Sequence, residues 1–291
     1  MRVYEFKQVD VFTGVGLRGN PVAVVIDADD LSDEQMQRVA NWTNLSETTF
    51  ICEPTPNSGA DYLLRIFTPQ SELPFAGHPT VGSAHAYLEH GGARLDPDVL
   101  RQECGAGVLA IRAEGEDDSR LIFAETPEAK LVDEFGPSVD VISEALGVEV
   151  SSDPPPASVS NGPTWTFVQV PDSAMIGAMK PDMSALSRLS EDFGLTGLAV
   201  FALTGDDPMV RIRCFAPFFG VPEDPVTGSA NAALPAYLAH YGLLERTGRT
   251  YTSSKGLEMG RDGRVHVRVG EDGRVEIGGQ AVTVVEGEIR L

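Results

Sequence analysis

A short pattern that occurs twice constrains this chain more than any other feature of its sequence. Residues 77–86 read GHPTVGSAHA, and residues 223–232 read EDPVTGSANA, almost half of the 291-residue chain later. Each copy follows an apolar segment that starts with an arginine and ends with a proline, residues 65–69 (RIFTP) and 213–217 (RCFAP). A repeat with so long a period predicts two similar domains, each with a helix that begins at the repeated pattern.

The repeated pattern also indicates how each helix starts and packs. Pro79 and Pro225 suit the first position of a helix, so His78 and Asp224 are the predicted N-caps. Both copies continue with Gly-Ser-Ala, and residues this small let strands approach a helix closely. Strand patterns surround each helix in the sequence. We therefore predict an α+β protein of two similar domains, each a mixed β-barrel wrapped around a central α-helix.

Composition narrows the classes of partner. The formal net charge is -21, and so acidic a surface repels phosphate, which argues against nucleic acid or an anionic membrane as a partner. No apolar run approaches the ~20 residues of a membrane helix, and the first residues lack a signal-peptide core, so we expect a cytoplasmic protein. Cys52, Cys104 and Cys214 are widely spaced without a Cys-x-x-Cys motif, which favours reduced thiols.

One motif in the first half matches a dinucleotide-binding pattern but lacks its context. Gly14, Gly16 and Gly19 form a G-x-G-x-x-G after a predicted strand. A dinucleotide site needs a helix next, whereas residues 20–25 read NPVAVV, which favours an extended chain. The motif is therefore interpreted as a glycine-rich connection between strands. The chain also has no phosphate-loop G-K-[ST], no H-E-x-x-H and no G-x-S-x-G motif, so no cofactor and no metal are predicted.

The two predicted helix starts are candidate binding sites for an anion. Backbone N–H groups in a first turn, with Ser83 or Ser229 nearby, suit the carboxylate of a small molecule. Each helix dipole contributes about 0.3–1 kcal/mol when exposed and up to ~2 when partly buried, so hydrogen bonds must supply much of the positioning. Plain helix capping is the alternative for Asp224, whereas histidine is an unusual N-cap, which favours a functional role for His78.

A candidate acid or base lies outside the repeat. Glu47 is in a Ser-Glu-Thr-Thr segment just before the apolar Phe50. Alignment of the two halves on Phe50 and Phe201 places Leu198 opposite Glu47, so the carboxyl group is not duplicated. A group that the repeated scaffold does not require suits general acid–base catalysis. A solvated acid near a strand start is the alternative interpretation.

Together these residues resemble the PhzF (phenazine biosynthesis-like) family, within the diaminopimelate epimerase-like fold. The resemblance covers nearly the whole chain, and the combination of motifs is specific although each alone is weak. The matching segments are 10–12 (DVF), 19–21 (GNP), 44–48 (NLSET), 67–69 (FTP), 72–78 (ELPFAGH), 220–230 (GVPEDPVTGSA), 256–261 (GLEMGR) and 278–282 (GGQAV).

The resemblance implies an architecture. It predicts a first domain of residues 1–126, completed by the C-terminal strand 281–291, and a second domain of residues 127–280. It further implies an active site between the two barrels, no cofactor or metal, and a homodimer.

The resemblance also implies roles for individual residues. Glu47 would move a proton between carbons of a small, cyclic, carboxylated substrate, as an isomerase. His78 and Asp224 would hold and polarise polar groups of the substrate. Its carboxylate would be bound by Gly77, Gly228 and Ser229. This mechanism requires Glu47, His78 and Asp224 to come together.

Two alternative functions remain open. Related epimerases and racemases carry a cysteine pair at the two helix starts, where this chain has His78 and Asp224, so racemisation by two thiols is disfavoured. A protein that binds small molecules or other partners without catalysis is the other alternative. Lys255 departs from the glutamine expected in the family's Gln-Gly-x-Glu-Met-Gly step.

Overall fold

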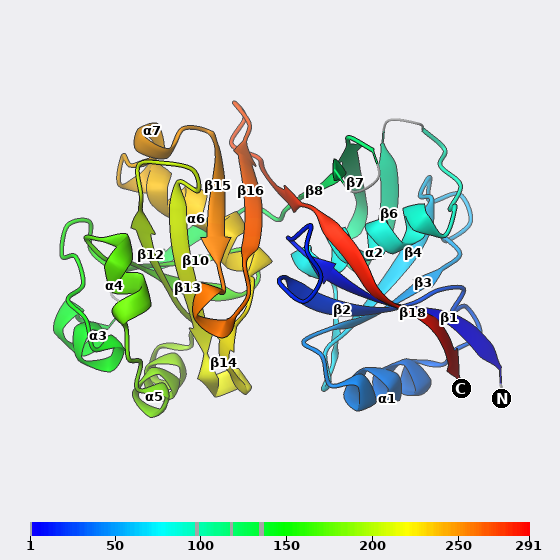
Figure 1. The fold of residues 1–291 in the computed structure, drawn as a ribbon, viewed down its shortest axis with the longest axis horizontal. Helices are drawn as coiled ribbons and strands as arrows, with labels where there is room; N and C mark the ends of the chain where they lie inside the picture. Colours follow the sequence, from blue (N-terminus) through cyan, green and yellow to red (C-terminus); the bar gives the residue numbers. More distant parts are fainter. Residues whose placement is uncertain (1, 97–98, 117–118, 134–136) are drawn as a thin grey trace. The chain divides into compact units, whose positions relative to one another are not determined.

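The computed structural model describes residues 2–96, 99–116, 119–133 and 137–291, which divide into two compact units (Figure 1). Unit 1 consists of Met1–Glu125 with Gly278–Leu291, and unit 2 of Thr126–Ile277. The two chain ends both belong to unit 1, where the backbone N–H of Arg2 donates to the carbonyl of Leu291 at 2.7 Å.

Unit 1 is a mixed sheet. Its strands pair in the spatial order β18-β1-β2-β3-β4-β6-β7-β8, and β5 is added beside β4. Pairs β2–β3 and β4–β6 are parallel and the others antiparallel. The strands are β1 (Val3–Val11), β2 (Asn20–Val25), β3 (Thr48–Cys52), β4 (Tyr62–Phe67), β5 (Glu72–Leu73), β6 (Leu100–Cys104), β7 (Gly107–Glu114), β8 (Leu121–Glu125) and β18 (Ala281–Arg290).

Helix α2 (Gly77–Glu89) is the centre of unit 1. It contacts β1, β2, β3, β4, β8 and β18, and every residue from His78 to Tyr87 is buried. A helix buried on all sides must be surrounded by other elements, so the sheet wraps around α2. Close packing depends on Gly82, where a Cβ atom would lie 2.5 Å from the Val22 side chain. This arrangement explains the small residues of the repeated pattern.

Unit 2 repeats the same topology. Its strands pair in the order β9-β10-β11-β12-β13-β15-β16, with β14 beside β13, and the pairs β11–β12 and β13–β15 are parallel. Its central helix α6 (Gly228–His240) is buried along most of its length and contacts β9, β10, β11 and β16. The strands are β9 (Lys130–Asp133), β10 (Ala157–Ser160), β11 (Thr164–Gln169), β12 (Gly197–Leu203), β13 (Val210–Ala216), β14 (Val221–Asp224), β15 (Thr250–Lys255) and β16 (Gly263–Val269). Strand β17 (Val275–Gly279) begins in unit 2 and ends in unit 1.

Further helices pack outside the sheets. In unit 1, α1 (Asp33–Thr43) begins with a capping box formed by Ser32 and Gln35 and shares an apolar core with β3 and β4. In unit 2, α3 (Val139–Leu146), α4 (Ser173–Ala178) and α5 (Met183–Phe193) share a core with β11, β12 and β13, and the short α7 (Leu244–Thr247) follows α6. None of the helices in the described residues combines the length and apolar character that crossing a membrane requires.

The glycine-rich motif of the first half connects two strands, as predicted. β1 and β2 are antiparallel neighbours, with Val11 opposite Asn20, and no helix follows Gly19. A Cβ atom at Gly19 would lie 2.3 Å from the carbonyl oxygen of Val11, so glycine is required here by the close approach of the two backbones.

The predicted helix starts were wrong in detail. The N-cap of α2 is Ala76, so His78 and Pro79 are the second and third helical residues. Proline is tolerated there because the N–H groups of a first turn have no acceptor within the helix. The N-cap of α6 is Thr227, and Asp224 ends β14 four residues before the helix. Asp224 is extended because it pairs with Cys214 of β13 as the last residue of the strand.

These starts change the correspondence between the two halves. Each central helix begins four residues after the end of a short strand, at Gly77 and at Gly228, so the positional counterpart of His78 is Ser229, not Asp224. The counterpart of Glu47 also moves by one residue. Thr48 pairs with Phe67 and Leu198 pairs with Phe215, so Glu47 corresponds to Gly197 and not to Leu198.

Candidate functional site

Glu47 and His78 come together in unit 1. The Nε2 atom of His78 lies 3.4 Å from Oε2 of Glu47, with the two side chains 8% and 16% exposed. Both atoms that face each other are inaccessible to solvent. A charge-assisted hydrogen bond is usually about 2.7–2.9 Å long, and catalytic hydrogen bonds often tighten only when the substrate is bound. The pair therefore lies at ion-pair distance, slightly beyond the length of a hydrogen bond, in the first turn of α2.

Buried hydroxyl groups hold the start of β3 in place. Thr48 shares a hydrogen bond of 2.7 Å with the Thr43 hydroxyl at the end of α1. The next residue, Thr49, shares one of 2.8 Å with Ser83 of α2 and donates to the carbonyl of Ala23 on β2. Since β3 is tied in this way to α1, β2 and α2, Glu47 is presented to the first turn of α2, where His78 lies.

In unit 2, the start of α6 is held by two side chains from the neighbouring hairpin. The indole of Trp165 donates to the Ser229 hydroxyl at 3.0 Å, and the Asn161 amide donates to the Ser229 carbonyl at 3.0 Å. Trp165 is almost fully buried, whereas Ser229 is partly exposed. Because the hydroxyl accepts from the indole, its own proton is left to donate to a further acceptor. Gly228 is buried beneath it.

Asp224 is adjacent to a buried ion-pair network. The guanidinium of Arg213 donates to both carboxylate oxygens of Glu223, at 2.9 and 2.8 Å, and to the carbonyl of Ile176 at 2.9 Å. Glu258 lies 3.9 Å from Arg213 and also accepts from Arg211. Burial alone lowers the pKa of Arg213, but the hydrogen bonds of Glu223 and the charge of Glu258 outweigh it and raise the pKa. This network fixes the strand that carries Asp224.

The predicted site residues thus form two groups, one in each unit. In unit 1, Gly77 starts α2 beside His78, which contacts Glu47. In unit 2, Gly228 and Ser229 are the first two residues of α6, and Asp224 precedes them. That both groups serve one substrate, as the sequence predicts, stays a prediction.

The sequence did not reveal the residues that support these groups. The ring of Trp165 and the amide of Asn161 lie more than sixty positions before Ser229 in the chain, so no local spacing indicates the contact. The arginine at 213 could have been found, because an arginine occupies the same place in both copies of the repeat.

The cysteines do not suit thiol catalysis. All three are buried free thiols. Burial raises the pKa of Cys52 to about 12, and burial also raises the pKa of Cys104 and of Cys214. A thiol becomes a useful base only as its thiolate. The prediction that racemisation by a cysteine pair is disfavoured is consistent with these directions.

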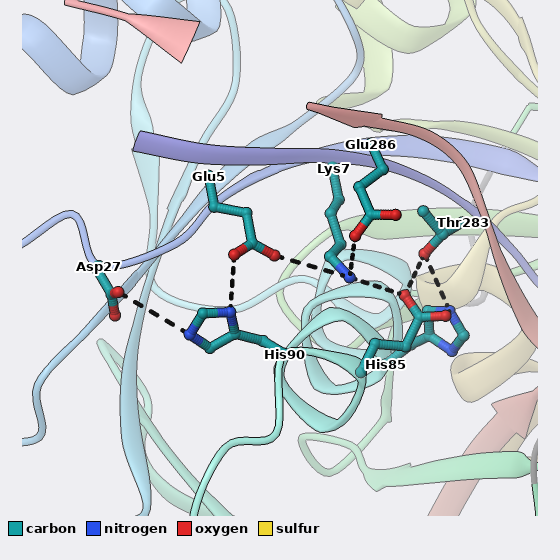
Figure 2. A network of polar contacts seen from close by, with 8 residues as sticks. Glu5, Lys7, Asp27, His85, His90, Thr283 and Glu286 are labelled. Carbon is teal, nitrogen blue, oxygen red and sulfur yellow. Dashed lines mark hydrogen bonds and ion pairs between the residues drawn. The ribbon is translucent and has the colours of Figure 1, made fainter. Parts of the chain in front are cut away.

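A second polar cluster lies at the far end of α2 and joins the C-terminal strand to unit 1 (Figure 2). The buried ammonium group of Lys7 lies 3.1 Å from Glu89 and 3.4 Å from Glu286. Glu89 also accepts from Thr283 on β18 and lies 3.2 Å from His85. An open hollow of about 530 Å³ is lined by Lys7, Glu89, Thr283, Val284 and Glu286. Its cation is already neutralised by carboxylates, so we interpret the cluster as structural.

Across the described ranges, no group of three or more His, Cys, Asp or Glu side chains is arranged to hold a metal ion.

Comparison with known proteins identifies the family. The family model for phenazine biosynthesis-like proteins matches residues 9–287. The chain belongs to the phenazine biosynthesis-like (PhzF) family. A crystal structure of a PhzF-family protein from Bacillus anthracis superposes with a TM-score of 0.87, at 28% identity, over 100% of both chains. The predicted family and fold class are thereby confirmed.

Two curated relatives of this PhzF-family chain have the same identity to it but different names. A trans-2,3-dihydro-3-hydroxyanthranilate isomerase from Pseudomonas chlororaphis is 38% identical over 99% of this chain and 100% of its own. A Schizosaccharomyces pombe protein named antisense-enhancing sequence 1 is also 38% identical, over 99% of both chains. The relatives named as isomerases confirm the isomerase class that the sequence predicts, while they do not determine the substrate.

Proposed function

We propose that this PhzF-family isomerase moves a proton between two carbon atoms of a small, cyclic, carboxylated substrate, with Glu47 as both base and acid. The observation that carries the proposal is the contact between Glu47 and His78 in the first turn of α2. A carboxyl group that accepts a proton from one carbon and returns it to another needs a neighbour that donates a hydrogen bond to its charged form and accepts one from its protonated form.

The steps follow from the chemistry of the residues. The Glu47 carboxylate takes a proton from a carbon beside an unsaturated group, and the C–H electron pair moves into the conjugated system of the ring. The protonated Glu47 then donates to a different carbon, where a new C–H bond forms, and returns to its starting state. His78 stabilises the carboxylate at the beginning and end of this cycle. General acid–base catalysis of this kind contributes typically about 10²–10⁴-fold.

The substrate's carboxylate and polar groups would be held by the helix starts. The backbone N–H groups at Gly77 and Gly228 and the hydroxyl of Ser229 are donors of the kind that bind an anion at a helix start. Asp224 would accept a hydrogen bond from an amino or hydroxyl group. The cyclic amino acid named for the Pseudomonas chlororaphis relative has such groups, so we propose a substrate of that class. The homodimer and the cytoplasmic location stay predictions.

Replacement of Glu47 by glutamine tests the proposal. Glu47→Gln keeps the shape of the side chain but removes the base, so conversion of trans-2,3-dihydro-3-hydroxyanthranilate should fall by about 10²–10⁴-fold. Mass spectrometry in H₂O and D₂O would measure the conversion and the deuterium that the product takes up. The exposed Glu34→Gln is the matched control and should leave turnover unchanged. Turnover that survives in Glu47→Gln would exclude Glu47 as the proton carrier.

The same assay separates the alternatives. A racemase or epimerase would take up deuterium while the product keeps the substrate's connectivity and loses its chirality. A protein that only binds the ligand would show neither conversion nor deuterium uptake.

A further inference from the structure

Lys255 is a buried cation for which the proposed reaction has no role. It ends β15, is 1% exposed, and its Nζ atom makes no hydrogen bond with any residue in the described ranges. The other buried lysine, Lys7, contrasts with it, because three carboxylates lie within 4 Å of the Lys7 ammonium group. A buried ammonium group without a partner costs several kcal/mol, so its position calls for a compensating interaction.

The backbone around Lys255 lies against the turn that leads into α6. Lys255 pairs with Gly263 on β16, where a Cβ atom would lie 2.4 Å from the Val226 side chain. A Cβ atom on the next residue, Gly256, would lie 2.7 Å from the carbonyl oxygen of Pro225. Glycine at both places therefore lets the end of β15 pack directly on residues 225–226, just before the helix.

The ammonium group of Lys255 lies close to the thiol of Cys214. It acts on the thiol of Cys214, which lies opposite Asp224 in the strand register, and the same thiol interacts with Thr227, the N-cap of α6. Burial raises the pKa of Cys214, while Lys255 and the Thr227 hydroxyl oppose that rise. Lys255, Asp224 and Thr227 thus all act on the buried thiol of Cys214, the charge of Asp224 in the opposite sense to the other two.

The glutamates of this region pair with arginines and do not neutralise Lys255. The two arginines of this region, Arg211 and Arg213, are paired with Glu258 and Glu223. No such ion pair of 4 Å or less joins Lys255 to a carboxylate among the residues with described positions. Asp224, whose charge opposes that of Lys255 at the Cys214 thiol, is the acidic group of this helix start, so Lys255 supplies the positive charge that adds to the α6 dipole there.

We propose that Lys255 is a specificity-determining residue: its charge behind the first turn of α6 makes this helix start select a carboxylate over a neutral group of the same shape. A glutamine in this place, as in the family pattern that the sequence resembles, would donate hydrogen bonds but supply no charge. Because the charge is buried, the selection should persist at an ionic strength that screens surface charges. The inference rests on the proposed binding of the substrate's carboxylate at Gly228 and Ser229.

Binding of a matched pair of probes tests the inference without turnover. Benzoate and benzamide have nearly the same shape, and only benzoate is charged. Their dissociation constants would be measured from the ¹⁵N chemical shifts of Gly228, Ser229 and Ala230 in the full chain. The wild type should prefer benzoate by at least about tenfold, since a nearby charge acting through an effective dielectric constant of about 20 changes a binding constant by that order.

Four variants complete the design. Lys255→Gln and Lys255→Met should lose the preference, and Lys255→Arg should retain it. Lys180→Gln removes an exposed lysine from the same unit and should behave as the wild type. If the methionine variant fails to fold, the glutamine and arginine variants still decide the question.

Three results would overturn the inference: no benzoate shift at these amides in the wild type, no preference for benzoate, or a preference that Lys255→Gln retains. Glu47→Gln should keep the preference for benzoate. Loss of the proposed isomerase reaction with this preference intact would refute the reaction and leave the role of Lys255 standing.

Discussion

Arg65 and Arg213 occupy corresponding places in the two units, and their replacement should have unequal consequences. Each donates two hydrogen bonds to a glutamate of the following short strand, Glu72 or Glu223. Each guanidinium also lies over the phenylalanine two residues later, at 5.3 and 5.0 Å from the ring centroid. The difference is burial. The Arg65 and Glu72 side chains are 24% and 42% exposed, whereas those of Arg213 and Glu223 are 8% and 11% exposed.

Burial sets the magnitude of each effect. Arg213→Ala leaves the Glu223 carboxylate and the Ile176 carbonyl without their donor in the interior, and the loss of one partner of a buried pair costs about 3–5 kcal/mol. In Arg65→Ala, water can solvate Glu72. An exposed pair contributes about 0.2–1 kcal/mol, and the lost contact with Phe67 about 0.5–1 kcal/mol more. The free energy of unfolding should therefore fall about 2 kcal/mol further in Arg213→Ala than in Arg65→Ala.

Urea unfolding would measure the difference unit by unit. Fluorescence of the buried Trp165 reports on unit 2, and hydrogen exchange of the β4 amides reports on unit 1. The double variant Arg213→Ala/Glu223→Ala should recover part of the lost stability, because it removes the unpaired carboxylate. Equal losses in the two single variants, or a double variant less stable than Arg213→Ala, would refute the reasoning.

Two further predictions concern unit 1. Gly82→Ala should lower the free energy of unfolding by about 1–2 kcal/mol, since overpacking against Val22 costs about 1–3 kcal/mol and exceeds the helix propensity gained. Gly287→Ala is the control and should change the stability little, because the space around Gly287 is open. Equal urea midpoints for the two variants would contradict the prediction for Gly82. Burial lowers the pKa of His85, although the charge of Glu89 opposes this. The folded state therefore favours the neutral imidazole. The stability that this contributes to the protein is present above the unfolded pKa of about 6.5 and is lost as pH falls through the folded pKa. Urea midpoints between pH 7.5 and 5.5 should therefore fall more steeply in the wild type than in His85→Gln, and parallel curves would exclude His85 as the cause.

Local signals predicted much of the fold. The glycine-rich motif before Pro21 is a strand connection, as predicted, because proline and valine favour extended chain. The register of the repeat was not predictable in the same way. Sequence identity aligned Gly82 with Gly228, but the structure aligns Gly77 with Gly228, since the helix start depends on packing against the preceding short strand.

The candidate site was predictable only in part. Glu47 stood out because the repeat does not duplicate it, and His78 because histidine is an unusual N-cap; the family resemblance then gave both residues a role. Their contact, and the support of Ser229 by Trp165, join residues far apart in the chain, for which local periodicity carries no information. Lys255 stood out as a departure from the family pattern, whereas its burial could come only from the structure.

The corrected register explains why Glu47 of unit 1 has no counterpart acid in unit 2. The residue that corresponds to Glu47 is Gly197, and a Cβ atom there would lie 1.9 Å from the carbonyl oxygen of Phe215. No side chain of any kind fits at that distance without displacement of the β13 backbone. The same topology therefore leaves space for a carboxyl group beside the central helix in unit 1 and closes it in unit 2. The counterpart of His78, the residue that contacts Glu47, is likewise Ser229, which contacts Trp165 and Asn161 instead of an acid. The packing therefore accounts for the presence of this carboxyl group in unit 1 alone, which is the asymmetry that the proposed function uses.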